Sequence, residues 1–133
     1  MKCLSVRQPW ADLIVNGKRF LEIRKWLTKY RGKILIHASL KIEKHECQRL
    51  NISPGYTGAI IGIVDLVSIK KLSKAEWSRM RHLHLEVGSR PYGEKTFAWI
   101  FRNPKKLTKP LPFVGKLGLF NVDVPDELVK HLK

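Results

Sequence analysis

The sequence predicts one mixed α+β domain over residues 1–133, built from short strands and short helices, with a small β-barrel as its expected form. The length of 133 residues lies inside the range of roughly 100–200 residues that is usual for one domain. Apolar residues make up 44% of the chain, which is enough for one core. Strand-like runs alternate with short helical and turn-like segments, and no repeat, linker or low-complexity tract divides them.

The first expected element is a short helix that begins near Pro9. Proline suits the first position of a helix, and Trp10, Leu13 and Ile14 recur at the spacing of one helical face. Gly17 favours the end of that helix, because glycine readily adopts the left-handed conformation found there.

The expected strands have either a period of two or a continuous apolar pattern. In the second of them, His37 lies on the face opposite Ile36. The third is rich in isoleucine and valine on both faces, as a buried strand would be, and Asp65 interrupts it. The expected strands are Leu21–Trp26, Lys33–Ser39, Ala59–Ile69, Lys95–Arg102 and Leu117–Val122.

Further helices are expected in three places. The run Leu40–Leu50 has only weak helical periodicity. Ser73 and Glu76 form a capping box, which predicts a helix over about residues 74–83. Pro125 begins a short C-terminal helix. Connections are expected at residues 51–57, at 88–94, and in a basic, proline-containing segment at 103–115.

The charge of the chain points to a polyanionic partner. Lysine and arginine number 26 against 11 acids, a formal net charge of +15, whereas a magnitude of about 2–8 suffices to keep a small domain soluble. Cations gain affinity for phosphates by releasing condensed counterions. Nucleic acid is therefore the expected partner, although ribosome-associated and membrane-surface proteins share such a charge.

Several other classes are not expected. No apolar stretch approaches the ~18 residues of a membrane span, and the first residues lack the apolar core of a secretion signal. Cys3 and Cys47 are too few for a disulfide framework, which favours a cytoplasmic location. His45-x-Cys47 and His82-x-His84 lack the spacing of zinc ligands, and no phosphate-binding loop is present. We expect no metal and no cofactor.

The densest basic stretch runs from Lys18 to Lys33 and holds one acid, Glu22. Trp26 and Tyr30 lie within it and could stack on bases while the cations follow the backbone. The alternative is that these rings belong to the core and the cations form a solvated face. A second, acid-free cluster contains Arg102, Lys105, Lys106, Lys109 and Lys116.

Two carboxylates are candidates for chemistry. Glu22 could pair with a neighbouring cation, accept a hydrogen bond from a base edge, or act as a general base. Asp65 lies in the middle of an apolar run, so it is either the structural partner of a cation or a functional group.

The chain resembles the ASCH domain family over most of its length. The opening pattern QPWA-x-LI-x-x-G-K followed by E-x-R-x-W, RG and IHA carries the resemblance. Its segments are Leu4–Ile14, Gly17–Lys18, Glu22–Trp26, Tyr30–Gly32, Ile36–Ser39, Gly62–Leu66, Phe97–Ile100 and Gly115–Phe120. The family implies a PUA-like fold, which is a small mixed β-barrel with short helices.

The resemblance also implies a nucleic-acid site in a cleft beside the first helix and the E-x-R strand. The expected nucleic-acid-binding residues, by resemblance and from the basic stretch, are Gln8, Trp10, Lys18, Glu22, Arg24, Trp26, Tyr30, Arg31 and His37. One branch of the family hydrolyses N4-acetylcytidine with a lysine and a threonine in G-x-K-x-x-T-x-R. Here those positions hold Arg19 and Glu22, and Lys18 lies one residue earlier. Candidate catalytic residues are Lys18, Glu22 and Asp65.

Three functions follow as hypotheses. The first is a binding module for nucleic acid, RNA more than DNA, in which cations position phosphates and aromatic rings stack on bases. The second is a nucleic-acid enzyme, an N4-acetylcytidine amidohydrolase or a ribonuclease, that uses the same cleft. The third is an interaction module for an acidic protein. A monomer is the expected state.

Overall fold

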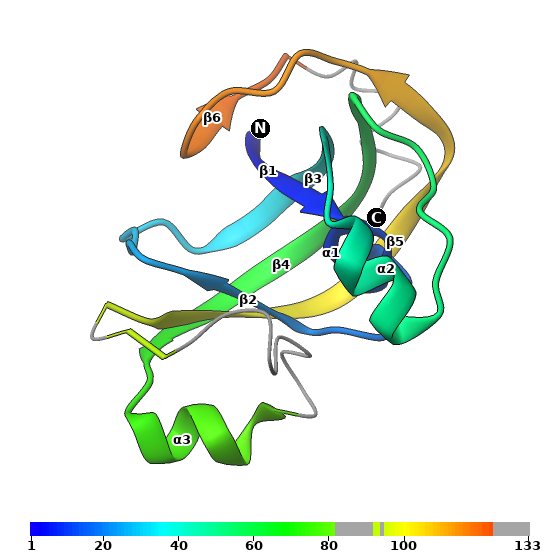
Figure 1. Ribbon diagram of the computed structural model, residues 1–133. Helices are drawn as coiled ribbons and strands as arrows, with labels where there is room; N and C mark the ends of the chain where they lie inside the picture. Colours follow the sequence, from blue (N-terminus) through cyan, green and yellow to red (C-terminus); the bar gives the residue numbers. More distant parts are fainter. Residues whose placement is uncertain (82–91, 94, 124–133) are drawn as a thin grey trace.

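The computed structural model describes residues 1–81, 92–93 and 95–123, and this part of the chain forms six strands and three helices (Figure 1). The strands are β1 (Lys2–Gln8), β2 (Leu21–Arg24), β3 (Gly32–Ile42), β4 (Ala59–Lys71), β5 (Phe97–Pro112) and β6 (Leu119–Asn121). The helices are α1 (Trp10–Val15), α2 (Lys44–Leu50) and α3 (Lys74–Arg79). The α+β class is confirmed. The expected C-terminal helix and most of the 88–94 connection lie outside the described residues.

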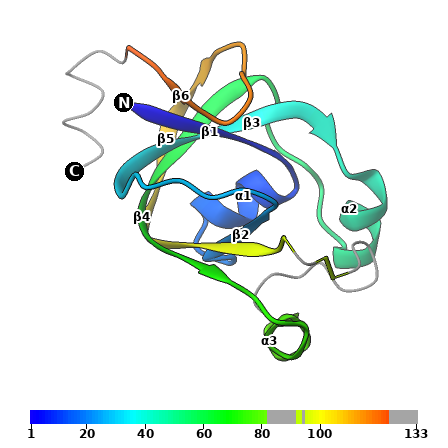
Figure 2. The same ribbon diagram turned by 90° about the vertical axis from the view of Figure 1, so that its left-hand side faces the viewer.

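The strands form one sheet in the order β2-β5-β4-β3-β1-β6. The pair β1 and β3 is parallel, and the other neighbouring pairs are antiparallel. The sheet curves around α1, which lies inside the bend (Figure 2). Its two edges are β2 and β6, and no pairing within the described residues joins them. Closure into a barrel therefore stays a prediction.

The main core fills the space between α1 and the concave face of the sheet. Leu13 and Ile14 from α1 are buried there, as their spacing predicted. The faces of β3 divide as expected, because Ile36 belongs to this core and Leu35 to a second cluster on the opposite face of the strand. The strand β4 supplies both clusters, as its two-sided apolar pattern predicted.

No strand was expected at residues 2–8, yet β1 lies between β3 and β6 in the sheet. Its Leu4 and Val6 enter the main core while Cys3 enters the second cluster. A strand that is buried on both faces has no clear alternation of apolar and polar residues, and this is why the sequence pattern did not reveal it.

The expected connection at 103–115 was also wrong, because β5 continues to Pro112. The pairing of β4 with β5 shifts register between Ile63 and Asp65, so Asn103 and Pro104 fall at the irregularity and not in the regular ladder. Beyond Ile100, β5 pairs with β4 but no longer with β2. Proline is tolerated at such positions because no ladder bond requires its missing N–H.

The predicted helix ends are largely confirmed. Gly17 follows α1 with φ +76°, and the N–H groups of Gly17 and Lys18 donate to the carbonyls of Ile14 and Leu13. The Ser73 capping box closes the N-terminus of α3. The weak helix expected over 40–50 is shorter, since β3 runs on to Ile42 and α2 begins at Lys44.

No helix within the described ranges is both long and apolar enough to cross a membrane.

Candidate nucleic-acid interface

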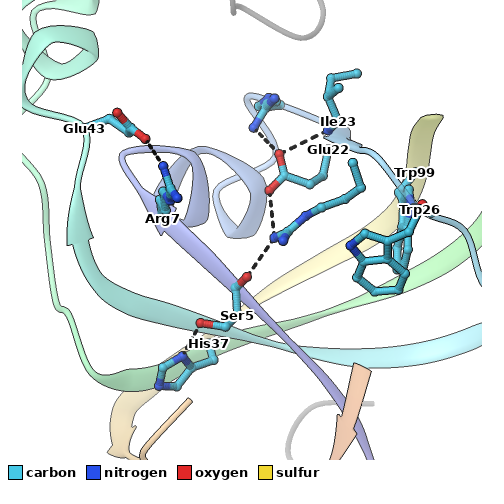
Figure 3. A network of polar contacts seen from close by, with 10 residues as sticks. Ser5, Arg7, Glu22, Ile23, Trp26, His37, Glu43 and Trp99 are labelled. Carbon is cyan, nitrogen blue, oxygen red and sulfur yellow. Dashed lines mark hydrogen bonds and ion pairs between the residues drawn. The ribbon is translucent and has the colours of Figure 1, made fainter. Parts of the chain in front are cut away.

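A cleft of about 1510 Å³ opens beside α1, where β1, β2 and the end of β3 face the segment after β5. This segment, Phe113–Gly118, is called the β5–β6 segment below. The residues that line it include Ser5, Glu22, Arg24, Lys25, Trp26, His37, Lys41, Glu43, Glu46, Val114, Lys116 and Leu117. Figure 3 shows some of the polar side chains that line the cleft, among them Ser5, Glu22 and His37.

Glu22 lies in the wall of the cleft, but its carboxylate is occupied by the protein itself. The side chain of Arg19 donates to Oε1 at 2.8 Å, and the backbone N–H of Ile23 donates to the same oxygen at 3.2 Å. Arg24 donates to Oε2 at 3.3 Å. The residue is 4% exposed. A general base needs a free lone pair facing its substrate, so this carboxylate is better placed to orient cations than to accept a proton.

The two arginines around Glu22 have different environments. Arg19 is completely buried, and its guanidinium stacks over the ring of Trp10 at 4.4 Å from the centroid. Arg24 is partly exposed at the cleft and donates to the backbone carbonyl of Ser5 at 2.7 Å, which ties β2 to β1. The E-x-R motif therefore builds the cleft wall while presenting the edge of Arg24 to it.

Ser5 and His37 form a second polar group in the cleft. The Ser5 hydroxyl lies 2.9 Å from His37 Nδ1, and His37 Nε2 lies 2.7 Å from the carbonyl oxygen of Phe113. Because a carbonyl only accepts, Nε2 carries the proton in the neutral ring, and Nδ1 then accepts from Ser5. Gly115 covers the pair, since a Cβ added there would lie 2.7 Å from His37 Cε1.

The acids and cations of the cleft are unevenly paired. Glu43 accepts from Arg7 at 2.7 Å, and Glu46 pairs with Arg49, so both acids are neutralised within the protein. Lys25, Lys41 and Lys116 are exposed, and no carboxylate among residues 1–81, 92–93 and 95–123 pairs with them. The uncompensated charge of the cleft is therefore positive.

The cleft brings together only part of the expected set. Trp10, Glu22, Arg24, Trp26 and His37 line it. The ring of Trp26 is half-buried and meets Trp99 edge to face, with centroids 4.7 Å apart.

The remaining expected residues lie outside the cleft lining. Gln8 is buried and donates to Asp12 and to the carbonyl of Tyr56. Lys18 is exposed beyond the end of α1. The Tyr30 hydroxyl donates to the carbonyl of Lys33, and Arg31 donates to the backbone carbonyls of Thr28 and Tyr30. These two side chains are thus engaged with their own turn.

Asp65 also lies away from the cleft. Asn103 donates to its Oδ2 at 2.8 Å and Lys33 to its Oδ1 at 3.2 Å. The hydrogen bond from Asn103, followed by that from Lys33, holds the pKa of Asp65 below its usual value of 3.8. Of the two interpretations of this residue, the geometry supports the structural partner of a cation.

Sequence reasoning missed Ser5, Lys41, Lys116 and the whole β5–β6 segment as parts of the cleft. Lys116 was counted in the second basic cluster, but the fold separates it from Arg102, Lys105, Lys106 and Lys109, which do not line the cleft. A usable signal was present in the sequence. At Leu40-Lys41 and at Lys116-Leu117, a cation stands next to an apolar residue at the start of the weak helix expected over 40–50 and of the strand expected over 117–122.

Comparison with known proteins agrees with this architecture. The chain is 29% identical over 137 aligned positions to activating signal cointegrator 1 of Homo sapiens and 28% identical to that of Mus musculus. In both cases 91% of this chain is covered, but it spans only 22% of the relative's length. A crystal structure of ASCH from Zymomonas mobilis superposes with a TM-score of 0.68 at 18% identity, covering 98% of this chain and 92% of the other.

A mutant of the Zymomonas mobilis protein, in which phenylalanine replaces a tyrosine, superposes with a TM-score of 0.65 and covers 98% of this chain and 94% of the other. At 18% identity, these two structures support the fold alone. The sequence profile of the ASCH domain matches residues 4–111, which is most of the chain. The resemblance found in the motifs is thereby confirmed, and the chain belongs to the ASCH domain family.

Proposed function

We propose that this chain is a nucleic-acid-binding domain that holds RNA in the cleft beside α1. One observation carries the proposal. The acids of the cleft, Glu22, Glu43 and Glu46, are each paired with an arginine, whereas Lys25, Lys41 and Lys116 have no carboxylate partner in the described part of the chain. Such an arrangement favours an anionic ligand, because the cations are available and the acids are already compensated.

The proposed roles follow from these positions. The three lysines contact phosphates and set the register of the strand. Arg24, oriented by Glu22, offers its outer edge to a phosphate or a base. Trp26 is half-buried at the cleft and supplies a ring on which a base can stack. Membership of the ASCH family is consistent with this proposal.

The test is the dependence of affinity on salt. We expect a labelled single-stranded RNA to bind with a log–log slope near −2 or steeper, since each neutralised phosphate contributes roughly −0.7. Fluorescence anisotropy across a salt series measures it, and a parallel DNA series compares the two nucleic acids. A slope near zero would contradict the proposal. Retention of an acidic protein after nuclease treatment, with no binding of RNA, would favour the protein-interaction module instead.

A second candidate is a hydrolase for modified nucleosides or RNA, and the Ser5–His37 pair favours it. A hydroxyl that donates to a histidine, whose other nitrogen is held by a third group, is the arrangement of an activated nucleophile. Ser5 Oγ would attack the amide carbonyl of an acetylated base while His37 takes its proton and returns it to the leaving amine. Water would then release the acetate.

This candidate is tested by turnover of N4-acetylcytidine and of RNA, each with and without a divalent metal. We expect Ser5→Ala to abolish any product while RNA affinity is kept, with the protein still folded but destabilised by about 1–3 kcal/mol, because buried His37 Nδ1 loses its donor. Lys33→Ala, which alters a partly exposed ion pair on β3 outside the cleft lining, is the control. Absence of product with the unmodified protein rules the hydrolase out for these substrates.

A further inference from the structure

The rim of the cleft carries apolar side chains that face solvent. Leu40 is 80% exposed, Val114 is 83% exposed and Leu117 is 99% exposed, and all three line the cleft. A single exposed leucine needs no explanation. Three around one concave, positively charged site indicate a surface that becomes covered when a ligand is bound.

The β5–β6 segment is fixed at its base and projects at its tip. Phe113 donates its N–H to the carbonyl of Gly58 at 3.0 Å and accepts from His37. Its ring stacks on Phe120 with centroids 6.2 Å apart and planes 12° apart. Val114 and Leu117 therefore extend from a backbone that is anchored at Phe113, so that the base of the segment is already in place before they contact a ligand.

Cations stand beside these apolar groups on both sides of the cleft. Lys41 follows Leu40 on β3, and Lys116 lies between Val114 and Leu117. In an uninterrupted duplex, the outer surface within reach is mostly phosphate and sugar, which offers nothing to a leucine. An unpaired base exposes an apolar face next to its own phosphates, so it can satisfy both kinds of side chain.

We propose that the tip of the β5–β6 segment, Val114–Leu117, is an apolar wedge that packs against an unpaired base. Lys41 and Lys116 hold the phosphates on either side. The cleft consequently takes nucleic acid that contains at least one unpaired nucleotide, in preference to an uninterrupted duplex. This inference rests on the proposed function and adds the class of substrate to it.

The experiment compares two RNA hairpins of the same stem, one fully paired and one with a single bulged 2-aminopurine. Anisotropy gives the affinity for each, and 2-aminopurine fluorescence reports the stacking of the bulged base. Val114→Ser and Leu117→Ser are the test variants, and both are expected to fold because the side chains are exposed. Val67→Ser is the matched control, since Val67 is 45% exposed on β4 and does not line the cleft.

We expect the unmodified protein to bind the bulged hairpin about tenfold more tightly than the paired one, with a change in fluorescence. Leu117→Ser and Val114→Ser should lose most of that preference, whereas Val67→Ser should keep it. If both hairpins bind equally with a steep salt slope, the wedge is overturned and the proposed function stands. If neither hairpin binds at any salt concentration, the wedge and the proposed function are both overturned. Self-association that Leu117→Ser abolishes would overturn the wedge and assign the tip to a second copy of the chain.

Discussion

Glu22 is the residue through which the cleft and the core are joined. Its carboxylate accepts from Arg19, which lies over Trp10 in the core, and from Arg24, which reaches the cleft. Removing water from such charges is costly unless each remains paired and hydrogen-bonded. The same carboxylate therefore pairs with a buried cation and orients a second cation at the cleft.

The first prediction concerns this ion pair. Glu22→Ala removes the carboxylate from an arginine with 0% of its side chain exposed, and we expect a loss of about 3–5 kcal/mol in the free energy of unfolding. Arg7→Ala breaks the Arg7–Glu43 pair, whose side chains are 54% and 37% exposed, and should cost less than about 1 kcal/mol. Urea unfolding followed by tryptophan fluorescence measures both. Equal losses for the two variants would contradict this account of Glu22.

The sequence indicated that Glu22 was unusual, and it also offered pairing with a cation as one explanation. The sequence could not decide among the possible roles of this carboxylate, because its role depends on how deeply it is buried and on which cations reach it. Neighbouring residues on one strand do not reveal that Arg19 folds back over Trp10 or that Arg24 reaches the carbonyl of Ser5. The sequence also could not show that the side chains of Tyr30 and Arg31 are engaged locally. Tyr30 donates to the carbonyl of Lys33 and Arg31 to that of Thr28, and the basic pattern does not predict these hydrogen bonds.

At the scale of elements, the β5–β6 segment is positioned by Gly115. A Cβ at this residue would lie 2.7 Å from His37 Cε1, 2.9 Å from His37 Nδ1 and 3.0 Å from Ser5 Oγ. Separations below 3.0 Å require movement of one of the groups. The absence of a side chain at residue 115 is thus what allows the segment to lie against β1 and β3.

The second prediction follows from that contact. Gly115→Ala should displace the β5–β6 segment and weaken RNA binding by a factor of roughly 10, because Val114 and Leu117 would lose their contact with the base; that factor corresponds to about 1.4 kcal/mol. Urea unfolding should change little, since the segment around residue 115 is exposed. Gly93→Ala is the control, because among the described residues the nearest atom to its added Cβ would be Thr96 Oγ1 at 3.9 Å. RNA affinity equal to that of the unmodified protein would show that the position of the segment is immaterial.

The third prediction concerns the ends of β4 and α3. The hydrogen bond from Lys70, followed by that from the Ser73 backbone, lowers the pKa of Glu76 from 4.5 to about 2. The folded state therefore favours the carboxylate, and this contribution to stability is complete above pH 4.5 and lost as the pH falls toward 2. The urea midpoint should fall more over that interval for the unmodified protein than for Glu76→Gln.

The comparison of these two proteins isolates Glu76, because Asp65, whose pKa is also lowered, is present in both. Parallel pH curves for the two proteins would mean that the interactions of Glu76 do not stabilise the folded state.

Helix ends were predictable because capping is local, as at Gly17 and Ser73. The length of β5 was not, because the sequence shows Pro104 but not the register shift in β4 that accommodates it. The cleft was likewise only partly predictable. Its first half lies within the opening motif, whereas the β5–β6 segment is brought to Ser5 and His37 by the curvature of the sheet.

At the scale of the whole molecule, the charge of +15 is divided between separate surfaces. Lys25, Lys41 and Lys116 stand around the cleft, whereas Arg102, Lys106 and Lys109 lie exposed along β5 and do not line it. Net charge alone would attract RNA to both surfaces. Only the first combines free cations with Trp26 and exposed apolar side chains, so specific binding should depend on it.

The last prediction separates these surfaces with two triple variants that remove the same three positive charges. Replacing Lys25, Lys41 and Lys116 by alanine should reduce the log–log salt slope for single-stranded RNA by about 2, because each lost phosphate contact removes roughly 0.7. Replacing Arg102, Lys106 and Lys109 by alanine should leave the slope nearly unchanged and lower affinity only through the long-range field.

Anisotropy titrations at matched salt concentrations measure both slopes, and unfolding curves verify that both variants are folded. Equal reductions would mean that RNA responds to net charge and not to the cleft. A larger reduction for the β5 variant would move the binding surface to the exposed cations of β5. The two slopes should differ because condensed counterions are released only where a cation contacts a phosphate. An RNA bound in the cleft would bring its phosphates to Lys25, Lys41 and Lys116 and not to the cations of β5.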